Sequence, residues 1–142
     1  MRCRTDETLR YVQFLARRFD KDDIHAVVLV ILFDLGFSPG SDGFGYLRRA
    51  IELCHANASA AVTKGIYPLI TYSDDAADSW RYVDQEIRRA IKTAWNEQDP
   101  EVWNIFFPRV PHCPSNKEFK ARIACIVELW HCCKEADYER AI

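Results

Sequence analysis

Residues 79–96, SWRYVDQEIRRAIKTAWN, limit the possible folds of this chain more than any other segment. The apolar positions recur at the spacing of an α-helix and would form one buried face, made of Val83, Ile87, Ala90, Ile91, Ala94 and Trp95. The opposite face is mostly basic and carries Arg81, Gln85, Arg88 and Lys92, with Tyr82 and Arg89 beside them. This pattern predicts a long amphipathic helix. Such a helix is more often an ordinary surface helix than one that lies in a DNA major groove, and the pattern alone leaves both interpretations open.

The overall composition is that of a globular chain without a basic excess. A length of 142 residues suits one domain with a hydrophobic core, and 49% hydrophobic against 28% charged residues excludes an intrinsically disordered chain. The formal net charge is −2, whereas dedicated nucleic-acid-binding proteins usually carry a basic excess. Any DNA-binding charge must therefore be local, and this balance counts modestly against a DNA partner.

No segment has the features of a signal peptide or of a transmembrane helix. The N-terminal MRCRTDETLR has no apolar core, and the longest apolar run, residues 26–33, is too short to span a bilayer. We therefore expect a soluble, cytoplasmic protein without membrane contact. The six cysteines should then be reduced thiols rather than disulfides.

Helical patterns separated by turn signals extend along the chain. Residues 24–35 are ambiguous, because the β-branched run IHAVVLVILF could also be a buried strand. The aspartates before this run, and Gly36 after it, favour a helix with a glycine C-cap. Ser115 and Glu118 have the spacing of a capping box that would start a last helix, which frays beyond Cys133. The other expected helices cover residues 6–19, 44–57, 60–67, 69–72, 79–96 and 100–107.

These elements predict an all-α fold, a compact bundle of about seven or eight helices without a sheet. Pro68 suits the first position of a short helix, and the polar residues 73–78, SDDAAD, suit a tight turn that supplies N-cap side chains. Together with the long helix from Ser79, they form a candidate helix-turn-helix at about residues 68–96.

Four short segments occur in an order and spacing that resemble a known family: YLRRAI at 46–51, TKGIYP at 63–68, AIKTAW at 90–95 and PSNKEF at 114–119. The family is the C-terminal DNA-binding effector domain of the stage-zero sporulation response regulator, the master transcription factor of endospore-forming bacteria. No single segment is diagnostic, but the ordered set is fairly specific. The resemblance implies a winged-helix-like, all-helical effector domain at residues 23–134, between an N-terminal extension helix at 1–22 and a C-terminal tail at 135–142.

In this family the helix after the turn enters the major groove of a promoter element. The resemblance therefore implies that Tyr82, Asp84, Gln85, Arg88 and Arg89 contact bases and phosphates of double-stranded DNA. Arg88 matches the residue type of the family, whereas Asp84 is shorter than the family's glutamate. Tyr82 and Gln85 replace arginines, and Arg89 replaces a histidine. A homodimer on tandem sites is one arrangement that the resemblance allows.

The chemistry of these side chains supports part of this assignment. Arginine grips guanine through O6 and N7 and glutamine grips adenine through N6 and N7, so Gln85 would shift preference toward adenine by about 1–3 kcal/mol. Lys92 and Lys64 could contact phosphates, which position a protein without specifying sequence. The full set of candidate DNA-binding residues is Arg81, Tyr82, Asp84, Gln85, Arg88, Arg89 and Lys92, with Lys64 and Ser79 as candidate phosphate contacts.

Three aspartates oppose the DNA interpretation. The segment before the long helix is longer than the family's and carries Asp74, Asp75 and Asp78, which would repel phosphate. The alternative is therefore a protein-interaction or regulatory module on the same fold that has lost specific DNA binding. The first expected helix, residues 6–19, lies outside the family match and is a candidate dimer or partner surface.

Catalysis, metal binding and phosphorylation have weaker support. The sequence lacks a P-loop, a nucleophile elbow and a glycine-rich dinucleotide motif, so we expect neither an enzyme nor a cofactor. Asp34 ends an apolar run, as a phosphoacceptor aspartate at a strand end would, but the resemblance implies that it lies in the first helix of the effector domain. We expect no phosphoacceptor domain before Ile24. We also expect no metal, because paired short spacings are missing among the zinc-ligand types His112, Cys113, His131, Cys132 and Cys133.

Overall fold

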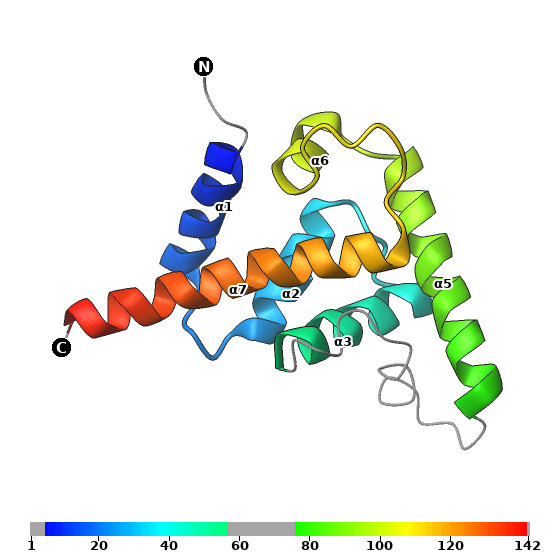
Figure 1. Cartoon of the computed structure of the whole chain (residues 1–142), viewed down its shortest axis with the longest axis horizontal. Coiled ribbons are helices and arrows are strands. Elements are labelled where there is room, and N and C mark those ends of the chain that lie inside the picture. Colours follow the sequence, from blue (N-terminus) through cyan, green and yellow to red (C-terminus); the bar gives the residue numbers. More distant parts are fainter. Residues whose placement is uncertain (1–4, 57–75, 142) are drawn as a thin grey trace.

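The computed structural model describes residues 5–56 and 76–141, with side chains placed for residues 7–56 and 81–134. The described residues form six α-helices and no strand (Figure 1): α1 Thr5–Arg18, α2 Ile24–Asp34, α3 Asp42–Ala56, α5 Ala76–Asn96, α6 Pro100–Phe106 and α7 Asn116–Ala141. The predicted all-α fold is confirmed for this part of the chain. The helices expected at 60–67 and 69–72, and with them the first half of the candidate helix-turn-helix, lie outside the described residues.

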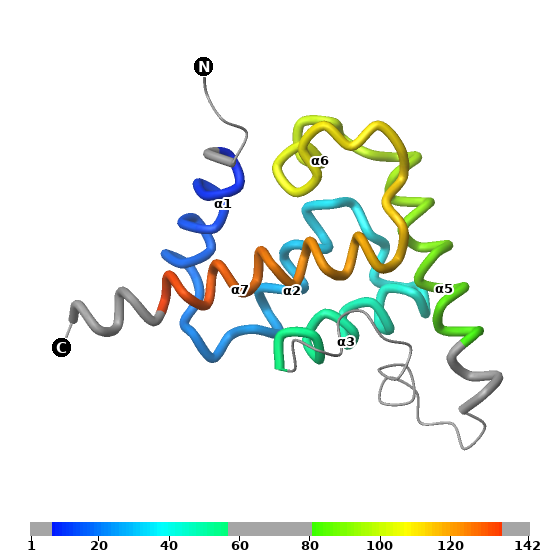
Figure 2. The backbone as a smooth tube through the Cα atoms, in the orientation of Figure 1, coloured from blue at the N-terminus to red at the C-terminus, as the bar shows by residue number. Residues whose placement is uncertain are grey.

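Helix α7 runs through the middle of the bundle and contacts all five of the other described helices. Helix α1 packs against its C-terminal half, α3 lies along it, and α5 stands beside its N-terminus at the opposite end of the molecule (Figure 2). Helix α5 makes its main contacts with α3. This arrangement leaves one whole side of α5 at the outer edge of the molecule (Figure 1).

The C-terminus of α2 explains why the ambiguous run is a helix. Gly36 adopts a left-handed φ of 87°, which a residue without Cβ reaches at no steric cost. The N–H of Gly36 donates to the carbonyl of Phe33 at 3.0 Å, and that of Phe37 donates to the carbonyl of Leu32 at 3.0 Å. This is the hydrogen-bond pattern of a Schellman motif, so the glycine C-cap predicted from the sequence is confirmed.

Aromatic side chains from several elements fill the part of the core around α6. Trp103 of α6 is 2% exposed, and its indole N–H donates to the carbonyl of Leu35 at 3.1 Å. Its ring packs edge-on against Trp95 at 5.5 Å and stacks on Phe107 at 5.5 Å, while Phe107 stacks on Phe119 at 5.2 Å. These contacts tie α6 to α2, α5 and α7.

Two helix boundaries differ from those expected. Helix α5 begins at Ala76, so residues 76–78 of the expected polar turn belong to the helix. Residues 76–78, AAD, can extend the helix in this way, because alanine has the highest helix propensity. Helix α7 continues to Ala141, through residues that were expected to form a tail. None of the helices that the structure describes is long and apolar enough to cross a bilayer.

The capping box at the start of α7 is confirmed. The hydroxyl of Ser115 accepts from the N–H of Glu118 at 3.1 Å, and the carboxylate of Glu118 accepts from the N–H of Ser115 at 3.3 Å. Ser115 holds the pKa of the Glu118 carboxyl below its usual value, through its side chain and its backbone N–H, and nearby positive charge lowers this pKa to a smaller extent.

Replacing Ser115 by alanine should lower the free energy of unfolding by about 0.5–2 kcal/mol at neutral pH. Because the pKa of Glu118 is lowered in the folded state, its contribution is present above the ordinary carboxyl pKa and is lost as the pH falls through the folded pKa. Urea denaturation at pH 7 and pH 3 should therefore show a smaller difference between wild type and Ser115→Ala at pH 3. Lys117→Ala, at an exposed position two residues further along, is the control; an equal loss in both variants would contradict the capping role.

Candidate nucleic-acid interface

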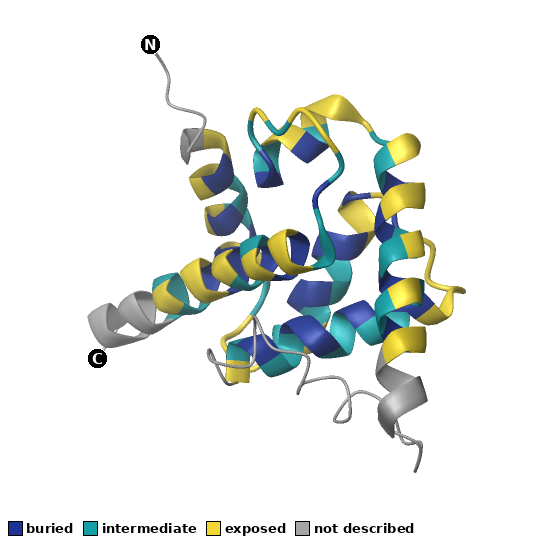
Figure 3. Cartoon of the chain, turned by 45° about the vertical axis from the view of Figure 1, so that its right-hand side comes forward, coloured by how far each residue is buried: buried dark blue, intermediate teal, exposed yellow. Residues whose placement is uncertain are grey.

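Helix α5 buries the apolar stripe that the sequence predicts. Val83, Ile87 and Ile91 are fully buried against the core, and Ala94 is 3% exposed. The outward positions form a continuous exposed side of the helix (Figure 3). A helix held on one face with its polar face open has the layout of a surface helix and equally that of a groove-binding helix.

Helix α3 approaches α5 more closely than any side chain would allow. A Cβ atom on Gly43 would lie 2.3 Å from the backbone oxygen of Glu86 and 2.9 Å from the Cβ of Ala90. The glycine therefore lets the two helix backbones touch. The sequence alone does not reveal this role of Gly43, because close approach of a distant segment leaves no local trace.

The outer side of α5 carries five of the predicted DNA-binding residues in exposed positions: Arg81, Tyr82, Gln85, Arg89 and Lys92. Arg81, Gln85 and Lys92 follow one another along the helix at helical spacing, so they form a single ridge, which we call the α5 ridge. Two cations with an amide between them suit phosphate contacts on both sides of a base contact.

Tyr82 and Arg89 lie on the flank of the ridge that faces α3. The Tyr82 hydroxyl donates to the Asp42 carboxylate at 2.7 Å, and its ring packs edge-on against Tyr46 at 6.0 Å. This hydrogen bond raises the pKa of Tyr82 to about 12, because it stabilises the protonated phenol beside a carboxylate. The Arg89 guanidinium pairs with Glu86 at 3.0 Å.

Asp84 and Arg88 lie on the other flank and are half-buried rather than exposed. Arg88 Nη1 donates to the carbonyl of Pro114 at 2.8 Å and lies 3.9 Å from the Cys113 sulfur. The side-chain amide of Asn116 donates to both the carboxylate and the backbone carbonyl of Asp84. The structure thus separates two of the predicted site residues from the α5 ridge and joins them to the start of α7.

The other residues predicted near the DNA have no described side chains. Lys64, Asp74 and Asp75 lie outside the described residues, and Asp78 and Ser79 belong to α5 without described side chains. No group of three or more side chains suited to holding a metal ion occurs within the described ranges.

The apolar face of α1 is used inside the chain. Val12, Leu15 and Ala16 are buried, and the Lys134 ammonium of α7 donates to the carbonyl of Ala16 at 2.8 Å. Among its outward residues, Leu9 is 40% exposed. A face that already packs on α7 offers little apolar surface to a partner, so the partner surface expected on residues 6–19 gains no support from packing.

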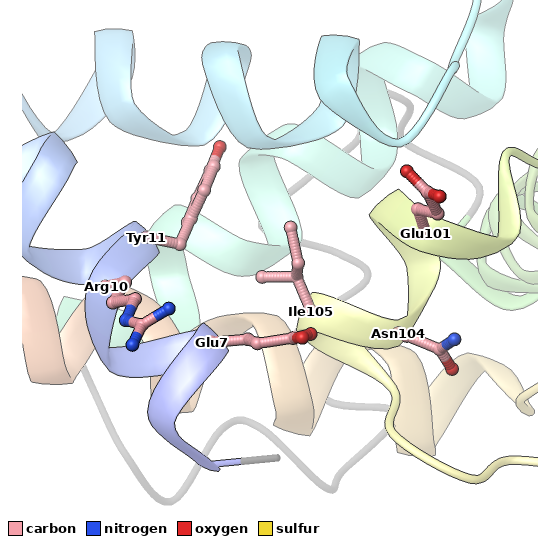
Figure 4. Close-up of a pocket in the computed structure, with 6 residues that line it drawn as sticks. All are labelled: Glu7, Arg10, Tyr11, Glu101, Asn104 and Ile105. Carbon is pink, nitrogen blue, oxygen red and sulfur yellow. The ribbon is translucent and has the colours of Figure 1, made fainter. Parts of the chain in front are cut away.

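An open groove of about 550 Å³ lies between α1 and α6, which contact each other beside it (Figure 4). Its floor includes the ring of Tyr11, whose hydroxyl points toward α2 and donates to Asp34 at 2.6 Å. Burial and this hydrogen bond raise the pKa of Tyr11. Asp34 is therefore a helix residue engaged by a tyrosine. The groove is lined by Glu7, Arg10, Tyr11, Glu101, Asn104 and Ile105.

One comparison with known proteins bears on the outer side of α5. A family model described as "Sporulation initiation factor Spo0A C terminal" matches residues 28–127. The matched residues include α3, α5 and α6, most of α2 and the first part of α7, whereas α1 lies before them.

Proposed function

The chain belongs to the Spo0A C-terminal family of sporulation initiation factors, a family of DNA-binding regulator domains, and we propose that it binds duplex DNA by placing α5 in the major groove. The α5 ridge is the single observation that carries this proposal. Arg81 and Lys92 would contact phosphates, and Gln85 between them would read an adenine edge. Residues 68–75 and the beginning of α5 would complete a helix-turn-helix, with Lys64 and Ser79 as further phosphate contacts.

The acidic side chains beside the α5 ridge favour recognition of DNA bases by a few residues over tight nonspecific binding to phosphates. Asp42 and Glu86 lie beside the ridge and engage Tyr82 and Arg89, so part of the local positive charge is balanced within the protein. Specific recognition would then depend on Gln85 and on Arg89 once it leaves Glu86. A homodimer on tandem sites would compensate for the modest charge of each copy.

Fluorescence anisotropy with a labelled duplex tests the proposal. The wild type should bind a duplex with the family's promoter element more tightly than a scrambled duplex, and binding should weaken as salt rises. In Arg81→Ala/Lys92→Ala, the slope of log affinity against log salt should be less steep by about 2, since two phosphate contacts are lost. In Gln85→Ala, the preference for the promoter duplex should fall by about 1–3 kcal/mol.

Arg10→Ala/Arg17→Ala is the matched control, because it removes two exposed cations from α1 and changes the net charge equally. Its salt slope should remain that of the wild type. If the control lost as much affinity as the ridge variant, the ridge would have no special role. Absence of binding at low salt would favour the alternative, a protein-interaction module on the same fold, which the net charge of −2 and the engaged Arg88 also suit.

A further inference from the structure

We infer that Asn116 is a positioning residue for DNA reading, which fixes the rotation of α5 about its own axis and so the direction in which Gln85 points. The inference rests on the proposed function. It assigns to the start of α7 a part in specificity, although none of the proposed DNA contacts lies in this segment.

The first step is the pair of anchors between α5 and the start of α7. The Asn116 amide nitrogen donates to the backbone oxygen of Asp84 at 2.8 Å and to its carboxylate at 3.0 Å. One turn further along, Arg88 donates to the carbonyl of Pro114 at 2.8 Å. Two anchors one turn apart hold the azimuth of a helix, whereas a single contact would act as a pivot.

The opposite flank of α5 is held by backbone contact. Gly43 of α3 lies so close to the carbonyl of Glu86 that no Cβ would fit between them. Asp84 and Glu86, the two residues on either side of Gln85 in the chain, are therefore anchored from opposite directions. The residue that would read the base is the one whose neighbours are both fixed.

Small rotations matter at this distance from the helix axis. Side-chain ends lie about 5–6 Å from the axis, so a rotation of about 20° moves them by about 2 Å. A bidentate contact between an amide and a base tolerates far less than that, because hydrogen bonds weaken steeply when distance and angle change. Loss of one anchor should therefore affect base reading before it affects phosphate contact.

The surroundings of Asn116 fix which way its amide points. Its Nδ2 atom faces two oxygens of Asp84, while its Oδ1 atom is buried and has no hydrogen-bond partner among the described residues. Reversing the amide would set Oδ1 against those oxygens. The side chain itself sits at the first position of α7, next to the capping box of Ser115, so α7 and its buried residues carry the anchor.

The test compares Asn116→Ala with Asn104→Ala, the same change at an exposed position in the groove between α6 and α1 (Figure 4). In Asn116→Ala, the ratio of affinities for promoter and scrambled duplexes should fall by at least about fivefold, the lower end of the discrimination from one base contact. The salt slope should not change, because no phosphate contact is removed. A purely structural role would lower both affinities together, so an unchanged ratio would overturn the inference.

Asn116→Asp provides a second variant if the alanine variant folds poorly. A carboxylate is favourable in the first turn of a helix, so this variant should fold, yet it lacks the N–H donors and faces Asp84 with a second negative charge. Its affinity ratio should fall at least as far as that of Asn116→Ala. Retention of the wild-type ratio by this folded variant would count against the inference as well.

Hydrogen exchange without DNA separates this inference from the proposed function. Amides in residues 84–92 of α5 should exchange faster in both Asn116 variants than in Asn104→Ala, because the anchor on α5 is lost. If the wild type binds no duplex, the proposed function fails, whereas faster exchange would still support the anchoring of α5 by Asn116. Unchanged exchange together with normal DNA discrimination would refute the anchor itself.

Discussion

Replacing Trp103 by alanine is expected to lower the free energy of unfolding by about 3–5 kcal/mol. The side chain is almost fully buried and touches Trp95, Phe107 and Phe119, so its removal leaves a cavity among rings that cannot all move inward. The variant also leaves the carbonyl of Leu35 without its indole donor. This loss approaches the whole stability of many single domains, so the variant should be partly unfolded at 37 °C.

Chemical denaturation of wild type, Trp103→Ala and Trp103→Phe would measure the effect. The phenylalanine variant keeps a ring but loses the hydrogen bond to Leu35, and it should lose clearly less stability than the alanine variant. A cost for Trp103→Ala below about 1.5 kcal/mol, the range of volume-conserving core changes, would show that α6 is not tied to the core as described.

Replacing Gly43 by valine is expected to destabilise the protein by about 1–3 kcal/mol or more, since extra atoms must enter a packed interface. The nearest atoms belong to the backbone of α5, which cannot rotate away as a flexible side chain would. The helices must therefore separate, and the α5 ridge should move with them. We expect a lower melting temperature and a weaker preference for the promoter duplex.

Gly45→Ala is the matched control on the same helix. A Cβ at Gly45 meets nothing within 4 Å, and alanine suits a helix interior better than glycine by about 0.5–1 kcal/mol. This variant should therefore gain stability and keep its DNA preference. A similar loss in both glycine variants would point to a general intolerance of α3 rather than to the contact with Glu86.

The sequence predicts the features that arise from neighbouring residues. Gly36 marks the end of α2, Ser115 and Glu118 form the capping box, and the apolar spacing gives the buried face of α5. The N-cap of α6 is equally local, since the Asp99 side chain accepts from the N–H of Glu101 at 3.0 Å. The resemblance to the sporulation family, carried by four short segments, is confirmed by the match over residues 28–127.

The sequence does not predict which polar side chains of α5 remain open to a ligand. Helical spacing places Arg88 on the same face as Gln85, but its guanidinium donates a hydrogen bond to the carbonyl of Pro114, in the loop before α7. Tyr82 is likewise engaged by Asp42, forty positions away in the chain. Such pairings depend on how distant segments pack, and no periodicity within one helix contains that information.

The packing of α1 against α7 has a consequence for biosynthesis. The buried side of α1 finds its partner on α7, and Lys134 reaches the carbonyl of Ala16 across 118 positions of sequence. At about 5–20 residues per second, a ribosome needs roughly 6–24 s to make that interval. The buried side of α1 is therefore without its α7 partner for at least that interval, and α1 can pack against α7 only after α7 has left the ribosome.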